Sequence, residues 1–312
     1  MIITVTLNPA MDKVLVVDQF NLNVTNRIQK QFNCVGGKGT HISINLSLMG
    51  IRNTAVGVVM GPTGDEILEA LGSMNIDVRF IRLEEGNSRT NYVLVDSSKN
   101  CTLIAEKGKL MDEDVIERLK QLYQSIINKG DIVVISGDAS NQRNTNLQKE
   151  LMDIAKDRGA KVCLDASGEH LYQGVRNGPF LIKPNLDELS TLYGKEIHNV
   201  QDILMAMDIL KDFGIENIVV SCGGEGSFAY SEGKYYHVAA PKVEVKNTVG
   251  CGDALLAGLL AGLERKLSMQ ENLRQATAVA AATAMNEATV GFDVKTADKL
   301  IKEIEVEIIE VN

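Results

Sequence analysis

The chain has 312 residues, of which 45% are hydrophobic, and its formal net charge is -9 at pH 7. A chain of this length can bury one large core or two unequal ones, and the acidic balance argues against binding to nucleic acid or a membrane surface. The longest apolar run, 254–263, is shorter than the about 20 residues that span a bilayer. The five cysteines form no C-x-x-C pair and are odd in number, which predicts reduced thiols in a cytoplasmic protein.

The first elements alternate between extended and helical patterns. A strand is predicted over 2–7, and extended segments without helical period follow in 12–35. Gly36-Gly37-Lys38-Gly39 then opens a helix that ends at Gly50. This is a glycine-rich turn at a helix N-terminus with a lysine inside it.

A second extended excursion interrupts the next strand–helix unit. A strand over 54–59 leads to Thr63-Gly64-Asp65-Glu66, which is predicted to be a capping box. Residues 88–108 then hold two extended runs joined by a polar turn. We expect 88–108 and 12–35 to form a small separate sheet, leaving a main domain of 1–11, 36–87 and 109–312.

From residue 110 onward, strands and amphipathic helices alternate regularly. Short β-branched runs at 132–136, 161–165, 180–183 and 217–221 are each bounded by helices. This pattern predicts an α/β fold with a mostly parallel central sheet covered by helices on both faces. Ligands of such sheets gather at the carboxyl ends of the strands.

A second glycine-rich turn lies near the C-terminal end of the alternation. Gly250-Cys251-Gly252 precedes an apolar helix in which Gly258 and Gly262 should allow close packing. Unpaired backbone N–H groups and the helix dipole make such a turn a site for an anion such as phosphate. Asp253 either caps this helix or accepts the proton of an attacking hydroxyl, and the turn alone does not separate the two.

One motif points to a different ligand. Residues 224–229 follow a strand and match the dinucleotide pattern G-x-G-x-x-A. The residues after them, 230–238, resemble a hairpin and not a helix, so a pyrophosphate would have no helix N-terminus to bind. A nicotinamide dehydrogenase is therefore disfavoured.

Five separated stretches resemble the PfkB (ribokinase-like) carbohydrate kinases, and the resemblance runs from residue 2 to about residue 290. They are Thr6-Leu7-Asn8-Pro9-Ala10-Met11-Asp12, Gly36-Gly37-Lys38-Gly39, Ser88-Arg89-Thr90-Asn91, Lys183-Pro184-Asn185-Leu186-Asp187-Glu188-Leu189 and Thr248-Val249-Gly250-Cys251-Gly252-Asp253. The first is similar to the branch that holds 1-phosphofructokinase, tagatose-6-phosphate kinase and the minor 6-phosphofructokinase. In that family the two extended excursions form a β-sheet lid over the sugar and often a dimer contact.

The resemblance implies in-line transfer of the γ-phosphoryl group of ATP to a sugar-phosphate hydroxyl. Asp253 would be the base, and the N–H groups of Gly250, Cys251 and Gly252 would form the anion hole. Asp12 would hold sugar hydroxyls. The other residues implied around the substrate are Gly37, Lys38, His41 and Arg89, with Arg27 of the lid near the existing phosphate.

The resemblance also implies a nucleotide and Mg²⁺ site. Asn185 and Glu188 are similar to an N-x-x-E motif in which Glu188 holds Mg²⁺ through water, although alone they indicate an ordinary helix cap. The nucleotide would be lined by Lys183, Asn185, Ser221, Gly223, Gly226 and Asn286, the last at the end of an alanine-rich helix. That helix is equally consistent with plain core packing.

Three departures from the family pattern concern sugar recognition more than phosphoryl transfer. His41 stands where the family usually has Asn, Cys251 and Ala254 replace Ala and Ser, and 102–108 lacks the usual Glu, Asn and Pro. We expect a kinase of a ketose monophosphate, with fructose 1-phosphate ahead of tagatose 6-phosphate and fructose 6-phosphate. The alternatives are a kinase of an unphosphorylated sugar or nucleoside, and a non-catalytic sugar-phosphate sensor. Because exposed sheet edges need cover, the lid is expected to pair in a homodimer.

Overall fold

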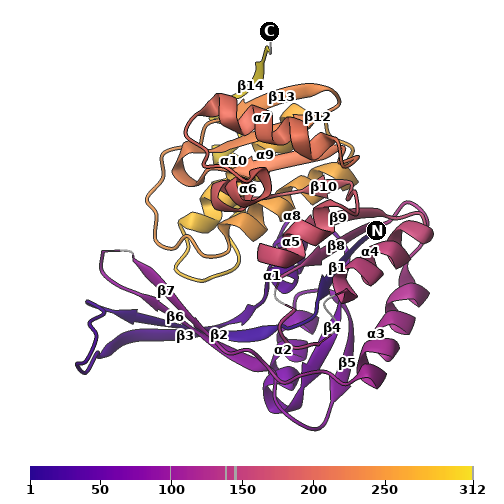
Figure 1. Ribbon diagram of the computed structural model, residues 1–312. Helices are drawn as coiled ribbons and strands as arrows, with labels where there is room; N and C mark the ends of the chain where they lie inside the picture. Colours follow the sequence, from indigo (N-terminus) through magenta and orange to yellow (C-terminus); the bar gives the residue numbers. More distant parts are fainter. Residues whose placement is uncertain (99, 138, 144–145, 311–312) are drawn as a thin grey trace.

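The computed structural model describes residues 1–98, 100–137, 139–143 and 146–310. Within them, ten strands form one sheet in the order β14-β13-β12-β11-β10-β9-β8-β1-β4-β5 (Figure 1). The strands are β1 (Ile2–Thr6), β4 (Asn53–Met60), β5 (Asp77–Leu83), β8 (Ile132–Ser136), β9 (Lys161–Asp165), β10 (Leu181–Ile182), β11 (Asn217–Ser221), β12 (Ser227–Ser231), β13 (Lys234–Val238) and β14 (Val306–Ile309). Seven neighbouring strands pair in parallel, in the order β5, β4, β1, β8, β9, β10 and β11. The pairs β11–β12, β12–β13 and β13–β14 are antiparallel. The predicted mostly parallel sheet is confirmed.

The central strands are short apolar runs because both of their faces are covered. In β1, Ile3 and Val5 belong to the core on one face and Ile2 to the core on the other. The edge strand β5 was not among the predicted strands. Its charged side chains Asp77, Arg79 and Arg82 are exposed, as suits a strand at the edge of a sheet.

Helices cover both faces of this sheet. On one face lie α3 (Glu113–Ile126), α4 (Leu147–Asp157), α5 (Gly168–Val175), α6 (Leu186–Tyr193) and α7 (Val200–Lys211). On the other lie α1 (Lys38–Leu48), α2 (Gly61–Gly72), α8 (Cys251–Glu264), α9 (Met269–Ala284) and α10 (Val294–Leu300). No helix of the described ranges has the length and apolar character needed to cross a membrane.

The pair α8 and α9 packs through small residues, as the sequence predicts. A Cβ added to Gly258 would lie 2.5 Å from the Cα of Ala276, and one added to Gly262 would lie 2.0 Å from Oδ1 of Asn272. A larger residue at Gly258 would have to displace the backbone of α9, and one at Gly262 would have to displace the side chain of Asn272. The alanine-rich helix is thus core packing along this contact, and a role against the nucleotide concerns only its end.

The start of α2 differs from the prediction. The helix begins at Gly61, with Met60 as the N-cap, so Thr63 is already helical and the predicted capping box is wrong. The backbone N–H of Thr63 instead donates to Oδ1 of Asn87 at 2.9 Å. An amide from a distant loop therefore satisfies the helix N-terminus.

The two extended excursions form one four-stranded sheet that projects from the main body (Figure 1). Its strands, in the order β3-β2-β6-β7, are β3 (Ile28–Gly36), β2 (Ala10–Val17), β6 (Arg89–Val95) and β7 (Cys101–Ala105). The β2–β3 and β6–β7 hairpins are joined by parallel pairing of β2 with β6. The predicted small sheet, called the lid below, is confirmed, whereas its boundaries as a separate domain stay a prediction.

Candidate active site

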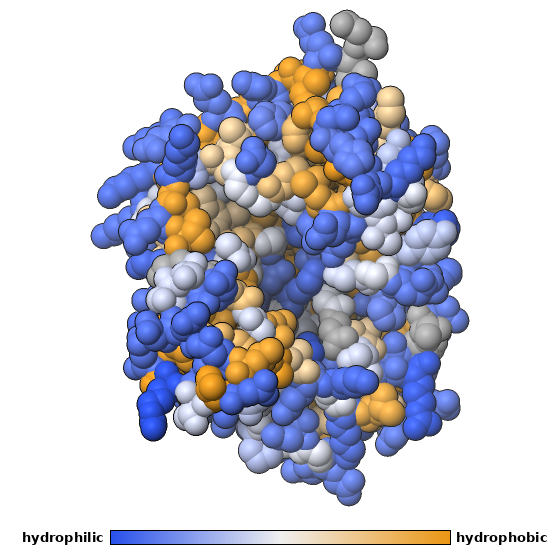
Figure 2. All heavy atoms as spheres, turned by 60° about the vertical axis from the view of Figure 1, so that its left-hand side comes forward, coloured by the Kyte–Doolittle hydropathy of each residue, from blue (hydrophilic) through white to orange (hydrophobic). Residues whose placement is uncertain are grey.

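The candidate site lies where strand ends of the main sheet meet the foot of the lid. β9 ends at Asp165, Lys183 follows β10, and β11 ends at Ser221. The helices α1, α6 and α8 begin near these ends, which is where open α/β sheets bind ligands. The molecular surface on the side of the lid is hollowed near the middle of the view, with many hydrophilic atoms around the hollow (Figure 2).

The turn before α8 requires glycine. Gly250 is the N-cap of α8 and has a left-handed φ of 82°, and a Cβ at this position would lie 1.9 Å from the carbonyl oxygen of Thr289. A Cβ added to Gly252 would lie 3.2 Å from Nζ of Lys183, so the ammonium group lies beside the turn. The N–H of Cys251 makes a long hydrogen bond of 3.4 Å to the carbonyl of Thr248. The N–H groups of a helix N-terminus and an adjacent cation together favour the binding of an anion.

Asp253 lies in the first turn of α8 and is 7% exposed. Its Oδ2 is 2.7 Å from Nδ1 of His41, a residue of α1 that lies 212 positions earlier in the chain. Among the described residues the carboxylate makes this hydrogen bond and none to a backbone N–H at the start of α8, whose N-cap is Gly250. The cap interpretation of Asp253 is therefore not supported.

Asp12 lies at the foot of the lid strand β2 and is 3% exposed. Nδ2 of Asn91 donates to its Oδ1 at 2.8 Å, and the hydroxyl of Thr289 donates to its Oδ2 at 3.2 Å. Nε2 of His41 lies 3.7 Å from the same Oδ2. His41 therefore lies between the carboxylates of Asp12 and Asp253.

A buried carboxylate that the sequence analysis did not assign to the site holds two of its cations. Oδ1 of Asp165 is 3.0 Å from Nζ of Lys38 and 3.6 Å from Nζ of Lys183. Burial would raise the pKa of Asp165, but the charges of Lys183 and Lys38 outweigh it and lower that pKa. Burial alone would lower the pKa of Lys38, but the charges of Asp165, Asp253 and Glu188 outweigh it and raise that pKa. The only local signal for Asp165 was an acidic residue ending an apolar strand.

Gly37 and Arg89 shape the region between α1 and the lid. Gly37, the N-cap of α1, has a φ of 107° that favours glycine. The buried guanidinium of Arg89 donates from Nε to the carbonyl of Asn8 at 3.0 Å and from Nη1 to that of Glu106 at 3.2 Å. Arg89 thus joins the foot of the lid to the turn after β1.

Arg27 lies apart from these residues. It is exposed in the β2–β3 connection, next to the pair Val17–Ile28, whereas Asp12 pairs with Cys34. Along β3, Ile28 lies six residues from Cys34, which corresponds to roughly 20 Å between the backbone near Arg27 and that near Asp12. Within a single chain, Arg27 therefore lies apart from Lys38 and Arg89, and its role at the acceptor phosphate stays a prediction.

Asn185 and Glu188 form a capping box at the start of α6. Oδ1 of Asn185 accepts from the N–H of Glu188 at 2.8 Å, and Oε2 of Glu188 accepts from the N–H of Asn185 at 3.0 Å. The hydroxyl of Ser167 donates to Oε1 of Glu188 at 2.6 Å. The ordinary cap interpretation is therefore correct for the free protein, and the metal role stays a prediction.

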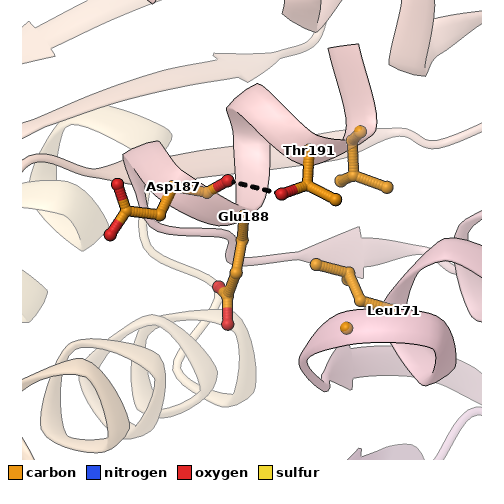
Figure 3. Close-up of a pocket in the computed structure, with 6 residues that line it drawn as sticks. Leu171, Asp187, Glu188 and Thr191 are labelled. Carbon is orange, nitrogen blue, oxygen red and sulfur yellow. Dashed lines mark hydrogen bonds between the residues drawn. The ribbon is translucent and has the colours of Figure 1, made fainter. Parts of the chain in front are cut away.

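A cavity of about 130 Å³ lies beside Glu188. It is lined by Gly168, Leu171, Asp187, Glu188, Thr191 and Leu192. Glu188 extends into the space beside Leu171, whereas the carboxylate of Asp187 points to the other side (Figure 3). Among the described residues no group of three or more His, Cys, Asp or Glu side chains is arranged to hold a metal. The donor set fits a Mg²⁺ ion bound through water and phosphate oxygens, not a cage of protein ligands.

The remaining nucleotide candidates lie on loops after β11 and α9. Gly223 begins a short 3-10 turn, and a Cβ on Gly226 would lie 1.9 Å from the carbonyl oxygen of Val238. β12 and β13 follow as an antiparallel hairpin, which confirms that no helix follows the G-x-G-x-x-A pattern. Asn286 donates to the carbonyl of Gly291 at 3.1 Å and thus orders the loop after α9. The roles of Ser221, Gly223, Gly226 and Asn286 in nucleotide binding stay predictions.

Comparison with known proteins assigns the chain to a family. Residues 5–295 match the pfkB family of carbohydrate kinases. The chain is 33% identical over 311 residues to a tagatose-6-phosphate kinase of Staphylococcus epidermidis, covering 98% of this chain and 99% of that protein. It is 32% identical over 287 residues to a 1-phosphofructokinase of Bacillus subtilis, covering 92% and 93%.

A solved structure agrees with these relatives. Phosphofructokinase-2 from Escherichia coli in complex with potassium matches with a TM-score of 0.89 at 25% identity, over 97% of this chain and 98% of that chain. The central sheet, the lid and the glycine-rich turn before α8 are therefore parts of one known architecture. The chain belongs to the PfkB family of carbohydrate kinases, whose members use ATP.

Proposed function

We propose that the protein is an ATP-dependent kinase that converts fructose 1-phosphate to fructose 1,6-bisphosphate. The observation that carries this proposal is the buried carboxylate of Asp253 beside an anion-binding turn flanked by Lys183. A base and a phosphate cradle at one helix N-terminus are what phosphoryl transfer to a hydroxyl needs.

The transfer follows from this arrangement. The acceptor hydroxyl oxygen attacks the γ-phosphorus, and its proton passes to Asp253. The bond between the γ-phosphorus and the bridging oxygen breaks, and ADP leaves with the electron pair. The N–H groups of Gly250, Cys251 and Gly252, with the ammonium of Lys183, stabilise the charge on the transferred group.

The residues implied for Mg²⁺ and the sugar take supporting roles. Glu188 would hold Mg²⁺ through water, and the ion would supply positive charge that neutralises the phosphates. Asp12 accepts hydrogen bonds from sugar hydroxyls, and Gly37, His41 and Arg89 surround the sugar. Lys38 supplies a cation beside it in a protein of net charge -9. Lys183 and Asn185 lie on the nucleotide side with Ser221, Gly223, Gly226 and Asn286.

We further propose that the protein is a homodimer through the lid. The occupant of the lid surface would be a second copy of the chain, because several apolar side chains are exposed on this sheet and its connections. They are Leu22, Val24, Ile28, Tyr92, Leu103 and Ile104. Arg27 is too far along the lid to reach the sugar of its own chain, so its assignment holds only if one lid reaches the site of the other chain. The cytoplasmic location stays a prediction.

Tagatose 6-phosphate is the second candidate acceptor, favoured by the 33% identity with a tagatose-6-phosphate kinase over 98% of the chain. A panel with ATP tests the choice, using fructose 1-phosphate, tagatose 6-phosphate, fructose 6-phosphate, free fructose, ribose and a nucleoside. We expect the highest kcat/KM for fructose 1-phosphate. A preference for an unphosphorylated acceptor would overturn the proposal, and binding without turnover would indicate a sensor.

A further inference from the structure

His41 is enclosed between two carboxylates, one from a strand of the lid and one from a helix of the main body. Its side chain is 5% exposed, with Nδ1 2.7 Å from Oδ2 of Asp253 on α8 and Nε2 3.7 Å from Oδ2 of Asp12 on β2. Nε2 is buried and makes no hydrogen bond of good geometry among the described residues, although the carbonyl of Val35 lies near the ring. A buried imidazole nitrogen that faces a carboxylate without bonding to it needs an explanation.

The protonation state of the imidazole decides whether this arrangement is favourable. A carboxylate only accepts hydrogen bonds, so Nδ1 must carry the proton that reaches Asp253. In the neutral ring, Nε2 then directs a lone pair at the Asp12 side of the site. In the imidazolium, both nitrogens carry protons and both carboxylates face a cation. The geometry matches the imidazolium.

The surroundings of His41 favour the same state. Burial would lower the pKa of His41, but the hydrogen bond and charge of Asp253, the charge of Asp12 and the carbonyl of Val35 together raise it. The other titratable groups near these carboxylates are Lys38, whose charge interacts with Asp253, and the thiols of Cys34 and Cys251. Burial raises the pKa of both thiols, and the charge of Asp253 raises that of Cys251 further. Asn91 and Thr289 hold Asp12 from its other side without charge.

We propose that His41 is a positioning residue that, as an imidazolium, ties the base Asp253 to the sugar-holding Asp12, and that loss of its proton weakens capture of the anionic acceptor. The inference rests on the proposed function. Deprotonation makes the cluster more negative by one charge where a sugar phosphate binds, and it leaves Asp12 with only its two neutral partners. Capture of the acceptor should therefore weaken as the pH rises through the pKa of His41.

Two substitutions distinguish the effect of the positive charge on His41 from the effect of its hydrogen bonds. In His41→Asn the amide keeps a donor near the position of Nδ1, and in His41→Gln it keeps one near the position of Nε2, but neither side chain takes up a proton. His198→Asn is the matched control, because the His198 side chain is 69% exposed and lies outside the site. Circular dichroism and thermal unfolding of each variant confirm that it is folded.

The kinetic test is the pH profile of kcat/KM for the acceptor from about pH 6 to about pH 9. We expect the wild-type and His198→Asn proteins to lose kcat/KM on the alkaline side, with a midpoint above 6.5, the ordinary value for histidine. For His41→Asn, kcat/KM should be about 10-fold below the wild-type value at the acid end of the range, and it should not fall on the alkaline side. A variant that keeps the wild-type limb would overturn the proposal.

A second measurement needs no substrate. The ring C–H signals of His41, assigned by their loss in His41→Asn, are followed by NMR titration of the full-length wild-type protein. A pKa of His41 above 6.5 is expected, and a value at or below 6.5 would contradict the inference even if the variants fail to fold. If no ketose monophosphate is phosphorylated but His41 titrates high, the proposed function fails and the charge state of His41 stands.

Discussion

Lys38 and Lys183 share a single buried carboxylate: the ammonium groups of both side chains lie within 3.6 Å of Oδ1 of Asp165. One negative charge at the end of β9 therefore stabilises two cations, one beside the sugar region and one beside the anion turn. Two like charges can be held this close to a phosphate site because Asp165 offsets part of their repulsion.

Asp165→Asn should destabilise the protein strongly. Removing the shared carboxylate leaves the buried Lys183 and the partly buried Lys38 without their partner, which costs about 3–5 kcal/mol. Urea unfolding at neutral pH checks this value. Asp77→Asn is the control, because its ion pair with Arg79 is exposed and is worth about 0–1 kcal/mol. Equal effects of the two substitutions would contradict the assignment of Asp165.

The same carboxylate predicts the acid response. The folded-state pKa of Asp165 is lowered because the charges of Lys183 and Lys38 outweigh the effect of burial. Its stabilising contribution is therefore fully present above the unfolded value of 3.8 and is lost as the pH falls through the lower folded value. Thermal unfolding between about pH 5 and about pH 2 should show a loss that is smaller in Asp165→Asn than in wild type.

Asp253→Asn should remove proton acceptance and leave the turn before α8 in place. We expect kcat to fall by about 10² or more with little change in ATP affinity. Asp298→Asn, on the exposed surface of α10, is the matched control. Steady-state kinetics and ATP titration measure the two quantities. Near-normal turnover in Asp253→Asn would mean that this carboxylate is not the base.

Gly250→Ala and Gly252→Ala should fail for different reasons. At Gly250 the left-handed backbone alone costs an alanine about 1–2 kcal/mol, and its Cβ would meet the carbonyl of Thr289. At Gly252 the Cβ would press on the flexible end of Lys183. We expect lower stability and turnover for Gly250→Ala, and chiefly weaker ATP binding for Gly252→Ala. Unfolding midpoints with ATP titrations distinguish them.

Arg89→Ala should affect phosphorylated acceptors more than free sugars if Arg89 holds the acceptor phosphate. The expected loss of kcat/KM for fructose 1-phosphate is roughly 10-fold to 100-fold, with little change for any activity on free fructose. Arg89 also donates to the carbonyls of Asn8 and Glu106. An equal loss of kcat/KM for both acceptors would therefore mean that Arg89 only holds the foot of the lid in place and does not bind the phosphate.

Leu103→Asp should weaken the proposed dimer. Leu103 is exposed on β7, so a carboxylate there leaves the single chain folded but is repelled from an apolar interface. Light scattering over micromolar concentrations should show a shift toward monomer. Met205→Asp, at another exposed apolar position, on α7, should leave the mass unchanged. If the wild-type protein is monomeric and fully active at these concentrations, the dimer proposal is wrong.

The sequence predicts the parts of this structure that depend on local pattern. The parallel sheet follows from short apolar runs between helices, and the anion turn follows from two glycines before an apolar helix. The ion pair of Lys38 with Asp165 joins residues 127 positions apart, so it depends on how the strands order in the sheet. The distance of Arg27 from Asp12 likewise follows from the length of the lid hairpin, which local pattern does not locate relative to the site.

The paired level of Asp12 and Asn91 in β2 and β6 has a further consequence. Both residues belong to the lid sheet, whereas His41 and Asp253 belong to helices of the main body. In the proposed mechanism, the residue that holds the sugar therefore belongs to the lid, and the residue that accepts the proton belongs to the main body. A tilt of the lid relative to these helices would change the distance from Asp12 to His41 but not the distance from Asp12 to Asn91. The distance between Asp12 and His41 therefore reports how closely the lid lies against the main body.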